Sequence, residues 1–332
     1  MRSIRTTVIV ALVALLLVPA ALLAQRPMRL GSIAPANSLW DKALKELASD
    51  IQDATDRRVR FRIDSSTQGS EATIIRRMKL NSTQAALLSQ PALGEIDPAF
   101  NVLGMPFFFE SDAEAQHVLA ALRPTFEESL SAQGLRLVSW GHTGWAHFFT
   151  ADPVNTLDDL KGARIFTSAG DDAMVQWYKQ NGFDPEPLEV TDVAMALNTG
   201  LINAYPLPPY AVMLVQYYKA AGHMLDVPLA PVINALIVTT EAWDALSAED
   251  QRTFQSRGDQ FEEQLWKDVP HQDQEAVDVM KTRGLKVSTP DPAALAEFRQ
   301  AADGLTDSMR ESMVPAAVYD LAVRERNSFR AR

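Results

Sequence analysis

The amino-acid sequence predicts an α/β protein of two domains, each with a mixed or mostly parallel sheet flanked by helices. Strand-like and helix-like segments alternate in residues 28–88, and the order β-α-β-α-β is typical of parallel strands joined by right-handed crossovers. A second βαβ-like unit lies in residues 153–209. Residues 25–332 are more than a single hydrophobic core usually supports, which favours two domains.

The first 24 residues have the pattern of a secretory signal peptide. Arg2 and Arg5 precede an uncharged run that ends at Ala24. We expect export and cleavage after Ala24. An uncleaved membrane anchor is the alternative, because Leu22 is a less favoured residue at the minus-three position.

The composition argues against several classes of protein. The chain has 31 basic and 42 acidic residues and a net charge of −11, so we expect no nucleic-acid partner and no anionic-membrane partner. It has no cysteine, which excludes disulfides, thiol catalysis and thiolate metal sites.

The first domain begins with a short buried strand at residues 28–33. Ser38 and Asp41 then form the capping pattern of a helix whose apolar residues recur at helical spacing. Residues 59–64 alternate apolar and charged side chains, the period of a half-exposed strand. A helix at 71–80 and a strand at 85–88 complete the unit.

Glycines mark the expected helix ends of the second unit. Gly162 ends a short helical turn, Gly182 ends a helix and Gly200 ends another. The expected elements are a strand at 164–167 and helices at 171–181 and 192–199.

Aromatic and helical segments fill the rest of the chain. A helix is expected at 111–122, and residues 135–150 are rich in β-formers but long for one strand. Residues 249–284 read as a long surface helix that contacts both domains, with a break at Pro270 as a further expectation. A last strand at 285–288 and a helical tail at 292–332 follow.

The second unit carries an ordered motif with the letters DLKGARIF and, further on, ALNTGLIN. It resembles the corresponding segment of DctP-type substrate-binding subunits of TRAP transporters. The resemblance implies a two-lobed periplasmic-binding-protein-like fold that closes over one small ligand in an interlobe cleft. It also implies a periplasmic location and integral membrane permease subunits as partners. Some TRAP systems add a tetratricopeptide-repeat periplasmic partner.

The resemblance also implies which residues form each lobe. Residues 135–150 and 230–240 are expected to cross between them. After the signal peptide at 1–24, we expect lobe I at 25–147 plus 234–284 and lobe II at 148–233 plus 285–332, with the long helix shared by both.

The sequence lacks the motifs of an enzyme or a metal site. It has no G-x-S-x-G, no H-E-x-x-H and no P-loop. His142 and His147 lie five residues apart on a strand and face opposite sides, which disfavours a zinc site. Adjacent acids are poorly spaced for hydrolysis and favour solvated positions; these pairs are Glu127-Glu128, Asp158-Asp159, Asp171-Asp172 and Glu262-Glu263. We expect no enzymatic activity, no cofactor and no metal.

The ligand class follows from a departure within the motif. In family members that bind carboxylates, an arginine follows the DLKG segment and pairs with the ligand; here Phe166 stands at that position. A second family arginine aligns with Ala146. Because burying an unpaired carboxylate is costly, we expect a neutral or substantially apolar ligand. An acidic ligand held by Arg164 is the alternative.

Loop positions and the resemblance together give the expected ligand-binding residues. They are Asn37, Ser38, Gln68, Ser89, Gln90, Phe107, Phe108, Trp145, His147, Phe166, Asn203, Tyr205 and Tyr210. Asn37 and Ser38 would otherwise cap a helix, and Trp145 would otherwise be core. Two other functions stay open: a periplasmic binding protein that feeds a sensor kinase, and a periplasmic hydrolase.

Overall fold

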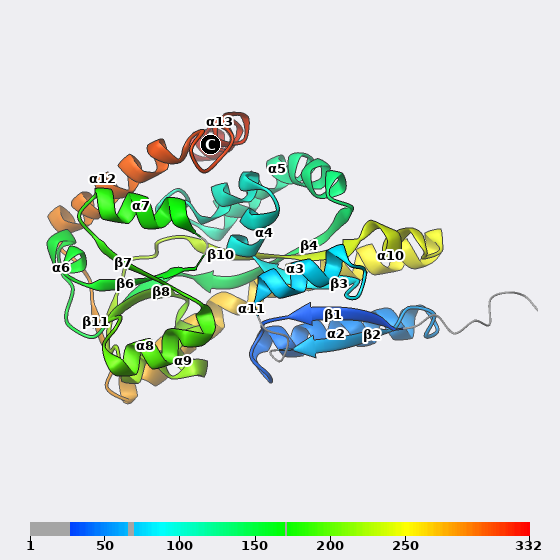
Figure 1. The fold of residues 1–332 in the computed structure, drawn as a ribbon, viewed down its shortest axis with the longest axis horizontal. Helices are drawn as coiled ribbons and strands as arrows, with labels where there is room; N and C mark the ends of the chain where they lie inside the picture. The colour runs from blue at the N-terminus through cyan, green and yellow to red at the C-terminus, as the bar shows by residue number, and fades with distance from the viewer. Residues whose placement is uncertain (1–26, 66–69, 170) are drawn as a thin grey trace, which may run out of the picture.

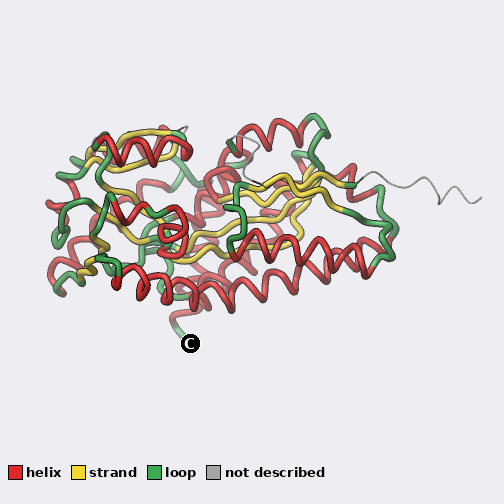
Figure 2. The backbone as a smooth tube through the Cα atoms, turned by 90° about the horizontal axis from the view of Figure 1, so that it is seen from below, coloured by secondary structure: helices red, strands yellow, loops and turns green. Residues whose placement is uncertain are grey.

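The computed structural model describes residues 27–65, 70–169 and 171–332 (Figure 1). The predicted signal peptide and Gln68 lie outside the described residues. The molecule is elongated, and its two sheets lie side by side along the long axis (Figures 1 and 2). We call the part built on the first sheet lobe I and the part built on the second sheet lobe II.

The sheet of lobe I has the strand order β2-β1-β3-β10-β4. Strands β1, β2 and β3 are parallel, as predicted, whereas β10 runs antiparallel to both β3 and β4. The sheet is therefore mixed. The strands are β1 (Met28–Ser32), β2 (Phe61–Ser65), β3 (Ala85–Ser89), β4 (Leu135–Trp145) and β10 (Pro231–Thr239).

Helices cover both faces of this sheet. The helices are α2 (Leu39–Ala54), α3 (Glu71–Lys79), α4 (Gln90–Ile96), the 3-10 helix η2 (Pro98–Gly104), α5 (Asp112–Ala132) and α10 (Thr240–Asp244). The predicted cap of α2 is confirmed, since the Ser38 hydroxyl accepts a hydrogen bond from the Asp41 N–H at 3.2 Å. Leu44 and Ile51 of α2 are fully buried in the hydrophobic core.

The sheet of lobe II has the order β11-β9-β5-β8-β6-β7 and is also mixed. Its strands are β5 (His147–Thr150), β6 (Arg164–Ser168), β7 (Asp184–Leu188), β8 (Ala204–Leu207), β9 (His223–Leu225) and β11 (Lys286–Ser288). Its helices are α6 (Leu157–Lys161), α7 (Asp172–Gln180), η3 (Val190–Asp192), α8 (Val193–Thr199), α9 (Pro209–Val215), η4 (Tyr217–Lys219) and α12 (Pro292–Met309).

Three strands of lobe II, β7, β8 and β9, were not expected from the sequence. Strand β7 contains Pro185 and Pro187 and lies at the edge of the sheet, where a missing N–H is tolerated. Strand β8 contains Pro206, and its pairing with β6 is recorded only at Ala204, before the proline. Because β7 and β8 contain prolines, the sequence pattern did not predict them as strands.

The chain crosses between the lobes at Ala146. This residue alone separates β4 from β5, so the expected crossing segment is two strands with a break. The Ala146 N–H donates to the Ala230 carbonyl, and the Leu229 N–H donates to the Ala146 carbonyl, both at 2.9 Å. The two crossing segments are thus hydrogen-bonded to each other at the boundary.

The long helix α11 (Ala248–Thr282) is continuous through Pro270, so the break expected there is absent. It contacts β4 and α2 of lobe I and α9 of lobe II, which confirms that both lobes share it. The last helix, α13 (Ala316–Arg330), packs along α5 of lobe I (Figure 1). The sequence analysis assigns this tail to lobe II; the exact lobe boundaries stay a prediction.

Candidate functional site

The carboxyl ends of the parallel strands in both sheets point to the lobe boundary. In lobe I, Ser89 at the end of β3 pairs with Asn234, near the start of β10, where the chain enters the lobe. In lobe II, Leu207 at the end of β8 pairs with His147, the first residue of β5. Strands β6 and β7 run parallel to β8. Open α/β sheets bind ligands beyond these strand ends, so the boundary is the candidate site.

A cavity of about 470 Å³ lies at this boundary. This volume lies within the range of small-molecule sites. Both lobes and helix α11 contribute to its lining: Glu110, Ser111, Asp112, Trp145, His147, Pro209, Met224, Asp226, Pro228, Pro270, Asp273, Gln274, Val277, Lys281 and Val287. The cavity includes two of the expected ligand-binding residues, Trp145 and His147.

The cavity is lined mainly by acidic rather than basic groups. Among its described lining residues, Lys281 is the one lysine or arginine, against four carboxylates. Asp112 accepts a hydrogen bond from the Trp145 indole N–H at 2.7 Å. Burial and the nearby Asp112 carboxylate raise the pKa of Asp273 to about 7, because neither is offset by a positive charge.

Acidic groups also face each other across the boundary outside this cavity. Burial, followed by the carboxylate of Glu189, raises the pKa of Glu95. Glu95 belongs to α4 of lobe I, and Glu189 directly follows β7 of lobe II. Burial likewise raises the pKa of Glu71, whose carboxylate accepts hydrogen bonds from the Ser89 N–H and hydroxyl.

The two histidines of the crossing segment have separate surroundings. His147 is half-buried and its Nδ1 lies 3.2 Å from the Leu225 carbonyl, a geometry that suits a neutral donor. His142 is fully buried and stacks on Trp266 with ring centroids 4.2 Å apart. Burial lowers the pKa of His142 to about 3. Within the described parts of the chain, no group of three His, Cys, Asp or Glu residues is placed to hold a metal ion.

Phe166 lies in the middle of β6 and is 9% exposed. It belongs to a buried cluster that also contains Tyr205 and Tyr210. Arg164, the proposed replacement for the family arginine, lies at the opposite end of β6 from the boundary. Its Nε donates to the Gly200 carbonyl at 3.0 Å. Phe166 is therefore a buried apolar residue two positions before the end of β6 that does not line the cavity, and Arg164 is bonded at the other end of the strand.

Tyr210 is the expected site residue that joins the two lobes most directly. Its hydroxyl accepts a hydrogen bond from the Leu39 N–H at 3.2 Å. Ser38, which precedes Leu39, is buried as the cap of α2, whereas Asn37 is exposed and its N–H donates to Asp41. The structure thus places these expected residues near the boundary, with Ser38 in a capping role.

Other expected residues have partners within the fold. Ser89 donates to Glu71, and the Gln90 amide donates to Asn101 at 3.2 Å. The half-buried Phe107 donates its N–H to the Leu229 carbonyl at 2.6 Å, next to the crossing. These contacts place Ser89, Gln90 and Phe107 near the boundary without showing that they bind a ligand.

Three further expected residues lie in less accessible positions. Phe108 is 1% exposed and lies under the Arg326 guanidinium of α13, 4.4 Å from its ring centroid. Asn203 accepts a hydrogen bond from the Arg164 N–H, at the end of β6 away from the boundary. Tyr205 is fully buried and stacks on Phe149. The structure does not bring these three together with Trp145 and His147.

Sequence reasoning missed the acidic residues of the cavity. Asp112 belongs to α5, Asp226 follows β9, and Asp273 belongs to α11. Each has the appearance of an ordinary surface acid in the sequence. The structure explains the glycine at 144, which has φ +111° and where any side chain would collide with the Asp273 carboxylate.

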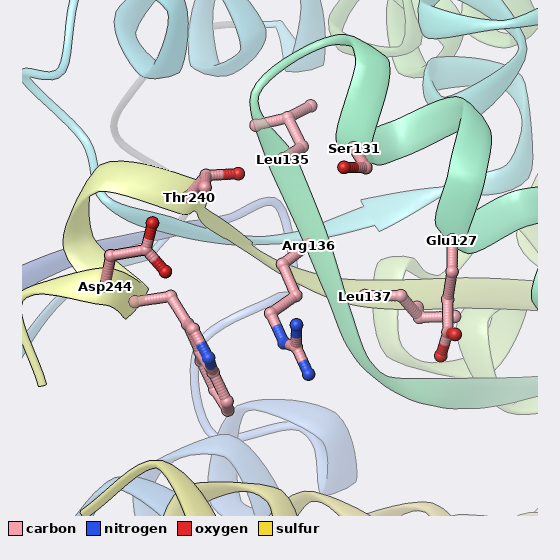
Figure 3. Close-up of a pocket in the computed structure, with 8 residues that line it drawn as sticks. Glu127, Ser131, Leu135, Arg136, Leu137, Thr240 and Asp244 are labelled. Carbon is pink, nitrogen blue, oxygen red and sulfur yellow. The ribbon is translucent and has the colours of Figure 1, made fainter. Parts of the chain in front are cut away.

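A second, smaller cavity of about 120 Å³ lies within lobe I (Figure 3). It is lined by residues of α5, β4 and α10, including Glu127, Arg136 and Asp244. The Arg136 guanidinium lies over the Trp243 ring, 4.6 Å from its centroid. None of the expected site residues lines it, and its volume is small for a solute.

Comparison with known proteins shows which family this chain resembles. Residues 30–312 match the family model described as "Bacterial extracellular solute-binding protein, family 7", known as DctP. The 2,3-diketo-L-gulonate-binding periplasmic protein of Escherichia coli is 25% identical over 275 residues, which cover 80% of this chain and 82% of that protein. A solute-binding protein of Chromohalobacter salexigens is 26% identical over 239 residues, covering 68% and 69%.

Solved structures share the fold. A TRAP periplasmic solute-binding protein of Haemophilus influenzae with bound L-gulonate has a TM-score of 0.83 at 20% identity, covering 91% of this chain and 98% of that one. One from Desulfovibrio salexigens with bound orotic acid has a TM-score of 0.84 at 16% identity, covering 91% and 99%. Within the described ranges, no helix is long and apolar enough to cross a membrane.

The expected two-lobed α/β fold is confirmed, and the relatives named above are binding proteins rather than enzymes. The family is extracytoplasmic and serves transport across the membrane, in agreement with the expected periplasmic location. This chain belongs to the DctP family of bacterial extracellular solute-binding proteins.

Proposed function

We propose that this protein is the receptor subunit of a TRAP transporter, and that it binds a neutral or largely apolar solute at the lobe boundary. Family membership supports a small-molecule ligand and membrane permease subunits as partners. The observation that carries the ligand class is the chemistry of the boundary. Phe166 and Ala146 are buried there, and Arg164 is bonded at the other end of its strand.

The charges around the boundary support the same conclusion. The cavity has four carboxylates and one lysine among its described lining residues. A dicarboxylate entering it would meet like charges at short range without the bidentate arginine partner that offsets desolvation. Trp145 and His147 offer instead an aromatic surface and hydrogen-bonding atoms, which suit a neutral solute.

Two solved structures of the same fold contain bound acids, whereas we propose a neutral ligand for this chain. L-gulonate and orotic acid occupy two proteins of the same fold at 20% and 16% identity, levels that establish the fold and leave the ligand open. Neither the sensor-kinase role nor the hydrolase role is favoured by any contact at the boundary. A tetratricopeptide-repeat partner likewise has no support in the fold or the relatives.

Calorimetric titration tests the ligand class. The purified protein would be titrated with neutral apolar solutes, with simple mono- and dicarboxylates, and with L-gulonate and orotate. We expect micromolar or tighter binding within the neutral group and none within the dicarboxylates. Submicromolar binding of a small dicarboxylate would contradict the proposal, and its loss in Arg164→Ala would show that Arg164 replaces the arginine that the family has at the position of Phe166.

A further inference from the structure

Tyr210 connects the two lobes through its side chain. It is the second residue of α9 in lobe II and is 9% exposed. Its hydroxyl accepts the Leu39 N–H at the first turn of α2 in lobe I, at 3.2 Å. The first N–H groups of a helix have no partner within the helix, and the Ser38 cap is used by Asp41. Lobe II therefore supplies an acceptor to a helix end of lobe I.

An aromatic contact reinforces this hydrogen bond. The rings of Trp40 and Tyr210 meet edge to face, with centroids 5.3 Å apart and an interplanar angle of 69°. Both residues are buried. Edge-to-face pairs favour such separations, and each adds stability beyond the area that it buries.

The backbone of Tyr210 is fixed to the shared helix. Its N–H donates to Asp273 Oδ1 of α11 at 2.9 Å. The Asp273 carboxylate also accepts the Trp145 N–H of the crossing strand and lies against Gly144. Thus Asp273 holds the start of α9 against α11, and Tyr210 extends from this anchor to α2.

We propose that Tyr210 is an interlobe latch, a positioning residue that stabilises the closed arrangement by bonding α9 to the start of α2 while Asp273 anchors it to α11. The latch rests on the receptor role of the chain and is independent of the ligand's chemistry. The sequence suggested a different role for Tyr210, direct contact with ligand. The two roles separate in the absence of ligand, because a latch changes the fraction of closed molecules and a ligand contact does not.

The size of the effect follows from one hydrogen bond. Tyr210→Phe removes the hydroxyl and keeps both the ring and the backbone bond to Asp273. A neutral hydrogen bond lost in the closed state alone lowers the closed-to-open ratio by about three- to tenfold. Tyr218→Phe is the matched control, since Tyr218 is also buried and its hydroxyl accepts a hydrogen bond at 3.5 Å from Arg283, which follows helix α11, rather than from lobe I.

Paramagnetic relaxation measures the closed fraction even when it is small. The chain contains no cysteine, so Met195→Cys, at a position 64% exposed on α8, gives a single nitroxide label in lobe II. The relaxation enhancement of lobe I backbone amides, including Leu39 and Trp40, is then recorded without ligand. Thermal unfolding of each variant checks that it is folded.

The latch predicts that Tyr210→Phe lowers the closed-to-open ratio, calculated from the enhancement, by about three- to tenfold and that Tyr218→Phe leaves this ratio unchanged. Two results would overturn it: an enhancement in Tyr210→Phe equal to that of the parent, or equal losses in both variants. A parent protein with no closed molecules in the absence of ligand would also overturn it. None of these results depends on which solute binds, so failure of the latch and failure of the proposed ligand class are distinguishable.

Discussion

Phe166 places an uncharged aromatic side chain where carboxylate-binding members of the family have an arginine. Its ring is buried in the hydrophobic core, so the residue contributes apolar area to lobe II and no positive charge. Asp273 has the complementary effect, because it places a carboxylate at the boundary with no basic partner recorded beside it in the described chain.

The burial of Phe166 can be measured by truncation. Phe166→Ala should lower the free energy of unfolding by about 3–5 kcal/mol, because it leaves a cavity in the cluster. Phe166→Leu, which refills most of that space, should cost clearly less. Urea unfolding followed by circular dichroism gives both values. A loss below about 1 kcal/mol for the alanine variant would show that the ring is not part of the core.

Asp273 predicts a pH dependence of stability. Its pKa is raised from 3.8 to about 7 by burial, so between these values the folded state binds more protons than the unfolded state. Stability therefore decreases as the pH rises from about 4 to 7. Asp273→Asn, which keeps an acceptor for the Tyr210 N–H, should remove this part of the slope. Denaturant unfolding at pH 4.5 and 7.5 would check it; an unchanged slope in the variant would contradict the assignment.

At the scale of elements, the sequence predicted those helices and strands that depend on neighbouring residues alone. The cap of α2 at Ser38 and the course of α11 follow from capping and periodicity, which neighbouring residues set. Strand β7 was missed because Pro185 and Pro187 hide a pairing that only its edge position permits. The acidic lining of the cavity was missed because α5 and α11 bring Asp112 and Asp273 together from distant parts of the chain.

The approach of α11 to β4 provides a test at this scale. At Gly144, with φ +111°, an added Cβ would collide with the Asp273 carboxylate. Gly134 has φ +70° and open space around its Cα. Gly134→Ala should thus cost about 1 kcal/mol from backbone strain alone, and Gly144→Ala at least about 2 kcal/mol more. Equal losses in thermal or urea unfolding would mean that α11 does not hold Asp273 against the strand.

For the whole molecule, two mixed sheets share one long helix and two crossing segments, and their parallel strands end at a common boundary. This arrangement allows the lobes to close over a solute, so that occupancy becomes a shape that a permease can recognise. The chain carries a net charge of −11, and the described lining of the boundary cavity has four carboxylates, of which Glu110 is paired with Arg330 at 3.7 Å. The transport role follows from the family, and the proposed ligand class is based on these charges and on Phe166.

The most direct measurement is native mass spectrometry of the solute that the protein carries through purification from its own periplasm. We expect one neutral or largely apolar molecule bound per chain, released when the protein is unfolded. A sugar acid or dicarboxylate bound at one per chain would contradict the account of Phe166 and of the acidic boundary.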